Sequence, residues 1–141
     1  MSNQLDQVIY TAHTHITGGR DGAGRSSDGA IDVMLSTPGS GQPGTNPEQL
    51  FGIGYSACFI VAMETAGKQR GIRLPKDAAI DADVSLGKTD GGTRYGLGAT
   101  LKISLPGMDT ATKRELVEAA HQTCPYSRSI RGNVDVQFEI V

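Results

Sequence analysis

Residues 44–59 read GTNPEQLFGIGYSACF, and the interpretation of the whole chain begins with this stretch. Its Thr-Asn pair can accept hydrogen bonds from the free N–H groups of a helix start, and Pro47 suits a first helical position. Glu48 complements the positive end of the helix dipole. Residues 50–63 are apolar or small, and Gly71 favours a stop. The sequence therefore predicts one long helix across this region.

The predicted helix has no broad polar face. Such a helix must be covered on every side, by a large core or by a partner chain. In a chain of 141 residues, a partner chain is the expected cover. The uninterrupted apolar run is shorter than the ~20 residues that a bilayer span needs, and it includes two glycines, a serine and a cysteine. Neither a transmembrane span nor any other membrane association is predicted.

Composition narrows the functional class. The length and apolar content predict one domain over residues 1–141. The formal charge of −2, with both signs interspersed, lacks the basic patch that nucleic-acid binding requires. Residues 2–7 are neither basic nor apolar, so no secretory signal is expected, and the cytoplasm is the expected location. The two cysteines are then expected to be reduced, or to pair transiently in catalysis.

The rest of the sequence predicts short strands and one further helix. Strands are expected over residues 7–16, 30–35, 79–86, 95–105 and 134–141. A second helix is expected from Asp109 or Thr110 to about Cys124, where Pro125 disfavours continuation. The order ββαββαβ indicates the α+β fold class.

Two candidate ligand sites are weak. The glycines at 18–24 could suggest a phosphate-binding loop, but no Lys-Ser or Lys-Thr pair follows them, so a tight turn is the preferred interpretation. His13 and His15 share one face of a predicted strand, but no third ligand has a suitable spacing. No metal and no other cofactor are therefore predicted. Arg20 lies inside the glycine cluster, where a turn alone gives no reason for a guanidinium.

The two cysteines are the remaining candidates for chemistry. Cys58 lies in the middle of the long helix, where the helix dipole cannot lower its pKa. A reactive thiolate there needs a cation from elsewhere, and Arg20 is the natural candidate. Cys124 either closes the second helix or caps a short turn begun by Pro125. The residues alone leave open which cysteine attacks first.

Six stretches together carry a family resemblance. They are residues 18–22, 27–29, 44–51, 54–59, 121–127 and 131–133. These stretches resemble the organic hydroperoxide resistance (Ohr) proteins, one branch of the OsmC superfamily, and the similarity spans nearly the whole chain. The resemblance implies an OsmC-like α+β fold with two antiparallel β-sheets flanking central helices. It also implies an intertwined homodimer with active sites at the subunit interface.

The resemblance further implies an activity. Members of the family are thiol-dependent peroxidases of bacterial cytoplasm that prefer alkyl and fatty-acid hydroperoxides, and the dihydrolipoyl groups of lipoylated proteins reduce them again. By this resemblance Cys58 is the peroxidatic cysteine, and Cys124 is the resolving cysteine that forms a disulfide with it. Arg20 and Glu48 are the pair that activates the thiolate.

The substrate-binding residues and the alternative functions are inferred from less specific features of the sequence. An apolar wall that favours organic peroxides is assigned to Phe51, Phe59 and Tyr126. A general thiol-disulfide oxidoreductase is an alternative, but it normally has a Cys-x-x-Cys pair, whereas these cysteines are 66 positions apart (124 − 58). A non-enzymatic binding protein for apolar ligands would leave both thiols inert.

One distance argument concerns the helix start. In a continuous helix, the backbones of Glu48 and Cys58 lie roughly 15 Å apart, too far for one side-chain contact. Either Gly52 and Gly54 break the helix, or Glu48 acts through Arg20 on the cysteine of a neighbouring subunit. The second alternative is favoured, because the apolar helix already requires a partner.

Overall fold

The structure is a computed structural model that describes residues 3–141. Met1 and Ser2 lie outside the described residues. Two predictions include these residues, the single domain over residues 1–141 and the absence of a secretory signal, and to that extent they also lie outside the described residues. The chain divides in sequence, between Pro47 and Glu48, into two compact units. The single domain over residues 1–141 stays a prediction.

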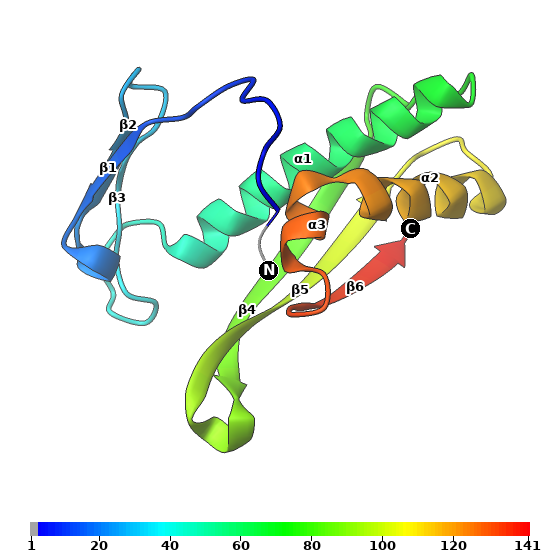
Figure 1. Cartoon of the computed structure of the whole chain (residues 1–141). Coiled ribbons are helices and arrows are strands. Elements are labelled where there is room, and N and C mark those ends of the chain that lie inside the picture. Colours follow the sequence, from blue (N-terminus) through cyan, green and yellow to red (C-terminus); the bar gives the residue numbers. More distant parts are fainter. Residues whose placement is uncertain (1–2) are drawn as a thin grey trace. The chain divides into compact units, whose positions relative to one another are not determined.

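The first unit is built on a three-stranded antiparallel sheet in the order β1-β2-β3 (Figure 1). Its strands are β1 (Thr14–Thr17), β2 (Ala23–Ser26) and β3 (Asp32–Met34). The strand predicted over residues 7–16 is too long, because the ladder with β2 extends no further than the pair of Thr14 and Ser26. Strand β2 itself begins inside the glycine-rich stretch, residues 18–24, for which the sequence predicts a turn.

Strand β2 is not predicted from the sequence because it contains glycine. Close packing requires glycine in and just before this strand. A Cβ on Gly24 would lie 2.5 Å from Cδ1 of Ile16 on the paired strand. A Cβ on Gly22, just before β2, would lie 1.6 Å from the carbonyl oxygen of Thr17. Glycine normally weakens a strand pattern, so strand propensity misses an element whose glycines permit the close approach of its neighbour.

The second unit begins with the long helix α1 (Pro47–Gln69), whose start and end confirm the sequence prediction. Gly71 has a φ of 68°, the left-handed conformation that ends many helices. Its N–H donates to the Lys68 carbonyl at 3.3 Å, and the N–H of Ile72 donates to the Gly67 carbonyl at 2.8 Å. These two bonds form a Schellman motif, which satisfies the last carbonyls of α1.

The sheet of the second unit has the order β4-β5-β6. Its strands are β4 (Ala79–Thr89), β5 (Arg94–Ser104) and β6 (Asp135–Ile140). Strands β4 and β5 form the predicted antiparallel hairpin, but β6 runs parallel to β5. This sheet is therefore mixed, in contrast to the two antiparallel sheets expected from the sequence. The helical crossover between β5 and β6 returns the chain to the same end of the sheet, which a parallel pair requires.

That crossover consists of α2 (Thr110–Thr123) and α3 (Pro125–Ile130). Asp109 caps α2, as one of the two predicted caps, by accepting the Thr112 N–H at 2.8 Å. Among residues 3–141, the observed order of elements has one strand, one short α-helix and two 3-10 helices more than the predicted order. The α+β fold class is confirmed.

Helix α1 lies across the β4-β5-β6 sheet in Figure 1, with α2 and α3 beside it. One core cluster joins these elements within the second unit. Its fully buried members include Tyr55, Phe59, Met63, Leu101, Ile103, Leu105, Ala120 and Cys124. The stripe of Leu116, Ala120 and Cys124 predicted on one side of the second helix is entirely buried.

The other side of α1 remains apolar but exposed. Ile53 is 70% exposed and Val61 is 59% exposed, and Leu50 adds to the same side of the helix. By length and composition alone, α1 could cross a membrane. Three large side chains on its opposite side are fully buried in the core, which is the arrangement of a core helix in a soluble domain.

Candidate active site

The two cysteines come together within the second unit. Cys58 lies half-buried in the middle of α1, and Cys124 is fully buried at the junction of α2 and α3. Both are free thiols, and both belong to the core cluster of the second unit, Cys124 as a fully buried member and Cys58 packed against it. Cys124 lies close enough to Cys58 to raise the pKa of its thiol, so residues 66 positions apart in sequence (124 − 58) come near each other in the fold.

The junction at Cys124 combines both alternatives that the sequence left open. Cys124 closes α2, where its N–H still donates to the Ala120 carbonyl at 2.7 Å, and it also precedes α3 as its N-cap. Its ψ of 124° is extended, because Pro125 disfavours the helical conformation in the residue before it. After this bend the backbone N–H of Tyr126 lies near enough to Cys58 to lower the pKa of its thiol.

The surroundings of Cys58 favour its neutral form. Burial raises the pKa of the Cys58 thiol above its ordinary value, and the adjacent Cys124 raises it further. The Tyr126 N–H acts in the opposite direction, because a donor stabilises the thiolate, but burial is the largest effect. A reactive thiolate at neutral pH therefore needs a cation in addition to these contacts.

Aromatic rings pack beside the cysteines. Phe51 contacts Tyr126 edge-on with ring centroids 6.0 Å apart, and Tyr55 stacks on Tyr126 at 5.8 Å. Of the three predicted wall residues, Phe51 and Tyr126 thus lie together, with Tyr126 38% exposed. Phe59 is fully buried and stacks on Phe138 of β6 at 5.3 Å, so it belongs to the core beneath the site.

Gly54 permits this arrangement of Tyr126. A Cβ at Gly54 would lie 2.6 Å from the hydroxyl oxygen of Tyr126, closer than atoms normally approach. The glycine therefore lets the tyrosine ring lie directly on α1. Each helical glycine costs roughly 1 kcal/mol against alanine, but α1 remains continuous through Gly54.

A buried hydrogen bond ties α1 to α3 next to the cysteines. The hydroxyl groups of Tyr55 and Ser127 are 2.7 Å apart, and both side chains are fully buried. Burial raises the pKa of Tyr55, so its hydroxyl stays protonated and available for this bond. The bond connects the helix that carries Cys58 to the helix that follows Cys124.

Ser127→Ala is expected to lower the free energy of unfolding by about 1–3 kcal/mol, because it leaves the buried Tyr55 hydroxyl without a partner. Urea unfolding measures the change. Ser129→Ala is the matched control, since Ser129 lies on the same helix but is exposed. Adding Tyr55→Phe to Ser127→Ala is expected to recover part of the loss. Equal costs for Ser127→Ala and Ser129→Ala would contradict this role.

The two charged residues of the predicted site lie on different elements. Arg20 is half-buried in a 3-10 turn, Gly19–Asp21, of the first unit. Glu48 lies in the first turn of α1, ten residues before Cys58 (58 − 48) in a continuous helix. The alternative that Gly52 and Gly54 break this helix is therefore wrong. The roles of Arg20 and Glu48 in activating the thiolate stay predictions.

Sequence reasoning missed the supporting residues of the site. Tyr55 and Ser127 lie inside two of the motif stretches, but nothing in those motifs shows that their hydroxyl groups meet.

Arg131 donates a hydrogen bond to the His121 carbonyl at the end of α2. Burial lowers the pKa of His121, and its Nδ1 is buried without a hydrogen-bond partner. Among residues 3–141, no three metal-ligating side chains gather in one place.

The chain is similar to known proteins in both sequence and structure. The family model described as OsmC-like protein matches residues 39–139. The chain is 50% identical over 139 residues to the organic hydroperoxide resistance protein of Xanthomonas axonopodis pv. citri, with 96% of each chain covered. Its structure resembles that of OhrB of Bacillus subtilis, with a TM-score of 0.89, 42% identity, and 95% and 100% of the two chains covered. An organic hydroperoxide resistance protein of Legionella pneumophila gives a TM-score of 0.87 at 36% identity, with 95% and 98% covered.

Proposed function

Since this chain belongs to the OsmC-like family and to its organic hydroperoxide resistance branch, we propose that it is a thiol-dependent peroxidase that reduces organic hydroperoxides to alcohols. The family assignment makes it a peroxide-detoxifying protein of the oxidative stress response. The observation that carries the cysteine mechanism is that Cys58 and Cys124, two free thiols far apart in sequence, pack in the same core cluster.

The proposed reaction has two steps. The Cys58 thiolate attacks one peroxide oxygen, the O–O bond breaks, and the alkoxide leaves and takes up a proton as the alcohol. Cys58 is thereby oxidised to a sulfenic acid. The Cys124 thiol then attacks the Cys58 sulfur, the sulfenic oxygen leaves as water, and a disulfide forms. The packing of both cysteines in one core cluster supports this step, because it brings the two thiols near each other.

Cys58 is the proposed attacking residue because it is the more exposed cysteine. Cys124 is fully buried, whereas Cys58 is only half-buried. Phe51 and Tyr126 beside it offer an apolar surface that suits alkyl and fatty-acid hydroperoxides better than hydrogen peroxide. We propose Arg20 as the cation that holds the thiolate, with Glu48 orienting its guanidinium.

The disulfide must be reduced for the next turnover. A dithiol such as dihydrolipoamide, free or on a lipoylated protein of the cytoplasm, is the proposed reductant by the family resemblance. Its first thiolate opens the Cys58–Cys124 disulfide to a mixed disulfide, and its second thiol releases the protein in the reduced form. Dihydrolipoamide is therefore expected to support faster turnover than glutathione.

Counting thiols tests the proposed function. Reduced protein mixed with one equivalent of tert-butyl hydroperoxide is expected to lose both thiols, yield one equivalent of tert-butanol and form an intramolecular disulfide. Free thiols are counted with a chromogenic disulfide under denaturing conditions, and mass spectrometry identifies the bridge. An apolar-ligand binding protein would keep both thiols. A general thiol-disulfide oxidoreductase would exchange with disulfide substrates but leave the hydroperoxide intact.

We propose that the chain works as a homodimer. The exposed apolar side of α1, with Ile53 and Val61, supports this proposal because an apolar surface of this kind favours association with a second copy. Light scattering is expected to give twice the mass of one chain. Ile53→Glu is expected to shift the protein towards monomers, whereas Glu118→Lys on the exposed surface of α2 is not.

Mixed dimers of Glu48→Ala and Cys58→Ser subunits test whether an active site combines both chains. If Glu48 of one chain serves Cys58 of the other, each heterodimer keeps one intact site and therefore partial activity. A heterodimer without activity, formed from folded parents, would place Glu48 and Cys58 of each site in the same chain.

A further inference from the structure

A second pocket lies in the second unit, at the other end of α1 from its start. The carboxyl-terminal half of α1 forms one side, and the extended segment that leads into β4 forms the other. The pocket has a volume of about 620 Å³, within the range that binds small molecules. Neither cysteine lines it, so it is separate from the candidate active site.

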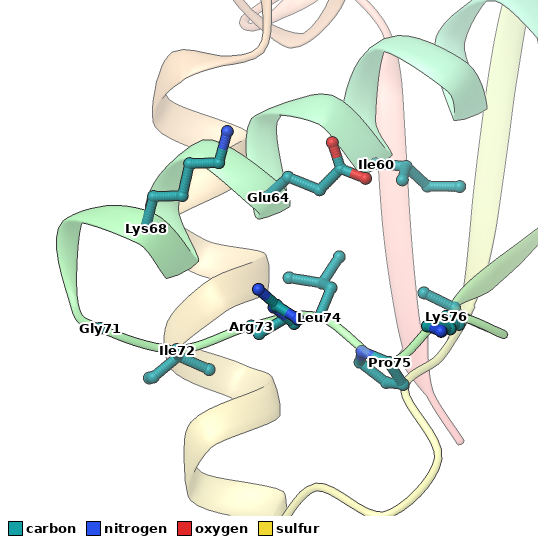
Figure 2. A pocket seen from close by; sticks show the side chains of 10 residues that line it. Ile60, Glu64, Lys68, Gly71, Ile72, Arg73, Leu74, Pro75 and Lys76 are labelled. Atoms are coloured by element: carbon teal, nitrogen blue, oxygen red, sulfur yellow. The ribbon is translucent and has the colours of Figure 1, made fainter.

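The lining of this pocket is apolar with a basic rim. Its apolar side chains are Ile60, Ile72, Leu74, Pro75 and Ala78. Figure 2 shows Leu74 pointing from the extended segment towards α1, with Ile60, Glu64 and Lys68 along the helix. Arg73 and Lys76 of the segment complete a set of three cations against the single acid Glu64. The pocket is therefore locally cationic on a chain whose formal charge is −2.

The three cations are available to a ligand. Lys68, Arg73 and Lys76 are exposed, and within the part of the chain that the structure describes none of them forms an ion pair. By contrast, the nearby Arg70 donates to Glu115 at 2.9 Å. Surface cations without a partner acid give the rim a positive potential that attracts an anion.

The wall of the pocket is held in place by the end of α1. The N–H of Ile72 donates to the Gly67 carbonyl at 2.8 Å, which fixes the start of the extended segment against the helix. A Cβ at Gly67 would lie 2.5 Å from the Ile72 carbonyl oxygen, so glycine permits this close approach. The pocket is therefore largely formed before any ligand arrives.

We propose that this pocket binds an anionic amphiphile, with its alkyl chain on the apolar lining and its carboxylate among Lys68, Arg73 and Lys76. A nucleotide fits less well, because the lining has no aromatic side chain on which a base could stack. The proposal does not depend on cysteine chemistry, so it is tested in a Cys58→Ser variant without peroxide.

Three ligands with the same alkyl chain provide the test: octanoate, 1-octanol and octylammonium. Methyl NMR spectra are recorded during titration, and octanoate is expected to shift the signals of Ile60 and Leu74. The neutral alcohol is expected to bind roughly two- to fivefold more weakly, the scale of an exposed charge interaction. Octylammonium is expected to bind most weakly of the three. Equal affinities, or no shift at either methyl group, would overturn the proposal.

Matched variants separate local from overall charge. Neutralising Lys68, Arg73 and Lys76 to glutamine is expected to weaken octanoate binding roughly two- to fivefold, to about the affinity of 1-octanol, while binding of 1-octanol stays the same. The control neutralises three exposed cations outside the pocket, Lys88, Arg114 and Arg128, and changes the net charge equally. Equal effects of the two triple variants would show that octanoate responds only to net charge and would overturn the proposal.

Discussion

Cys58→Ser is expected to abolish hydroperoxide reduction, whereas Cys124→Ser is expected to keep the first turnover. The difference follows from the proposed roles: a serine hydroxyl at position 58 provides no thiolate to attack the O–O bond. Without Cys124 the attack still occurs, so one equivalent of hydroperoxide is consumed per chain. The sulfenic acid at Cys58 then persists, because its buried neighbour can no longer condense with it.

Stopped-flow peroxide consumption and trapping of sulfenic acid with a dimedone probe measure these outcomes. Both variants are expected to fold, since serine is nearly isosteric with cysteine, and circular dichroism with urea unfolding provides the control. Catalytic turnover with dihydrolipoamide is expected to fall sharply in both variants, so the first turnover is the informative quantity. Equal loss of that turnover in the two variants would contradict the assignment of Cys58 as the attacking residue.

Local patterns in the sequence predicted the second unit well. The Pro47 start and the Gly71 stop of α1, the β4–β5 hairpin and the cap at Asp109 all depend on neighbouring residues, and all are confirmed. Such features are readable because the interactions that fix them span a few positions.

The sequence-based predictions were wrong where the structure depends on residues that are far apart in the chain. Strand β2 is hidden because Gly24 serves the packing of Ile16, and the parallel pairing of β6 follows from the path of the crossover. The hydrogen bond between Tyr55 and Ser127 joins residues 72 positions apart. For the site, the sequence singled out both cysteines, but only the structure shows that they pack in one core cluster.

Arg20→Ala is expected to slow hydroperoxide reduction about 100-fold at neutral pH, and the loss is expected to shrink as the pH rises. Burial, and after it the adjacent Cys124, raise the pKa of the Cys58 thiol above its ordinary value. Even an ordinary thiol, with a pKa near 8.5, is only about 3% ionised at pH 7, whereas an adjacent arginine can bring a cysteine pKa below 7. Without the cation, the thiolate fraction and the rate therefore rise roughly tenfold for each pH unit up to the pKa.

The pH profile distinguishes this role from a merely structural one. Arg25→Ala removes an exposed cation from β2 of the same unit and is expected to leave the profile unchanged. Arg20→Lys keeps the charge without the planar fork and is expected to restore part of the rate at neutral pH. The apparent pKa of Cys58, measured from iodoacetamide alkylation rates, is expected to rise in Arg20→Ala. A loss of equal size at every pH would instead mean that Arg20 orients the peroxide oxygens, because the thiolate fraction would then be the same with and without it.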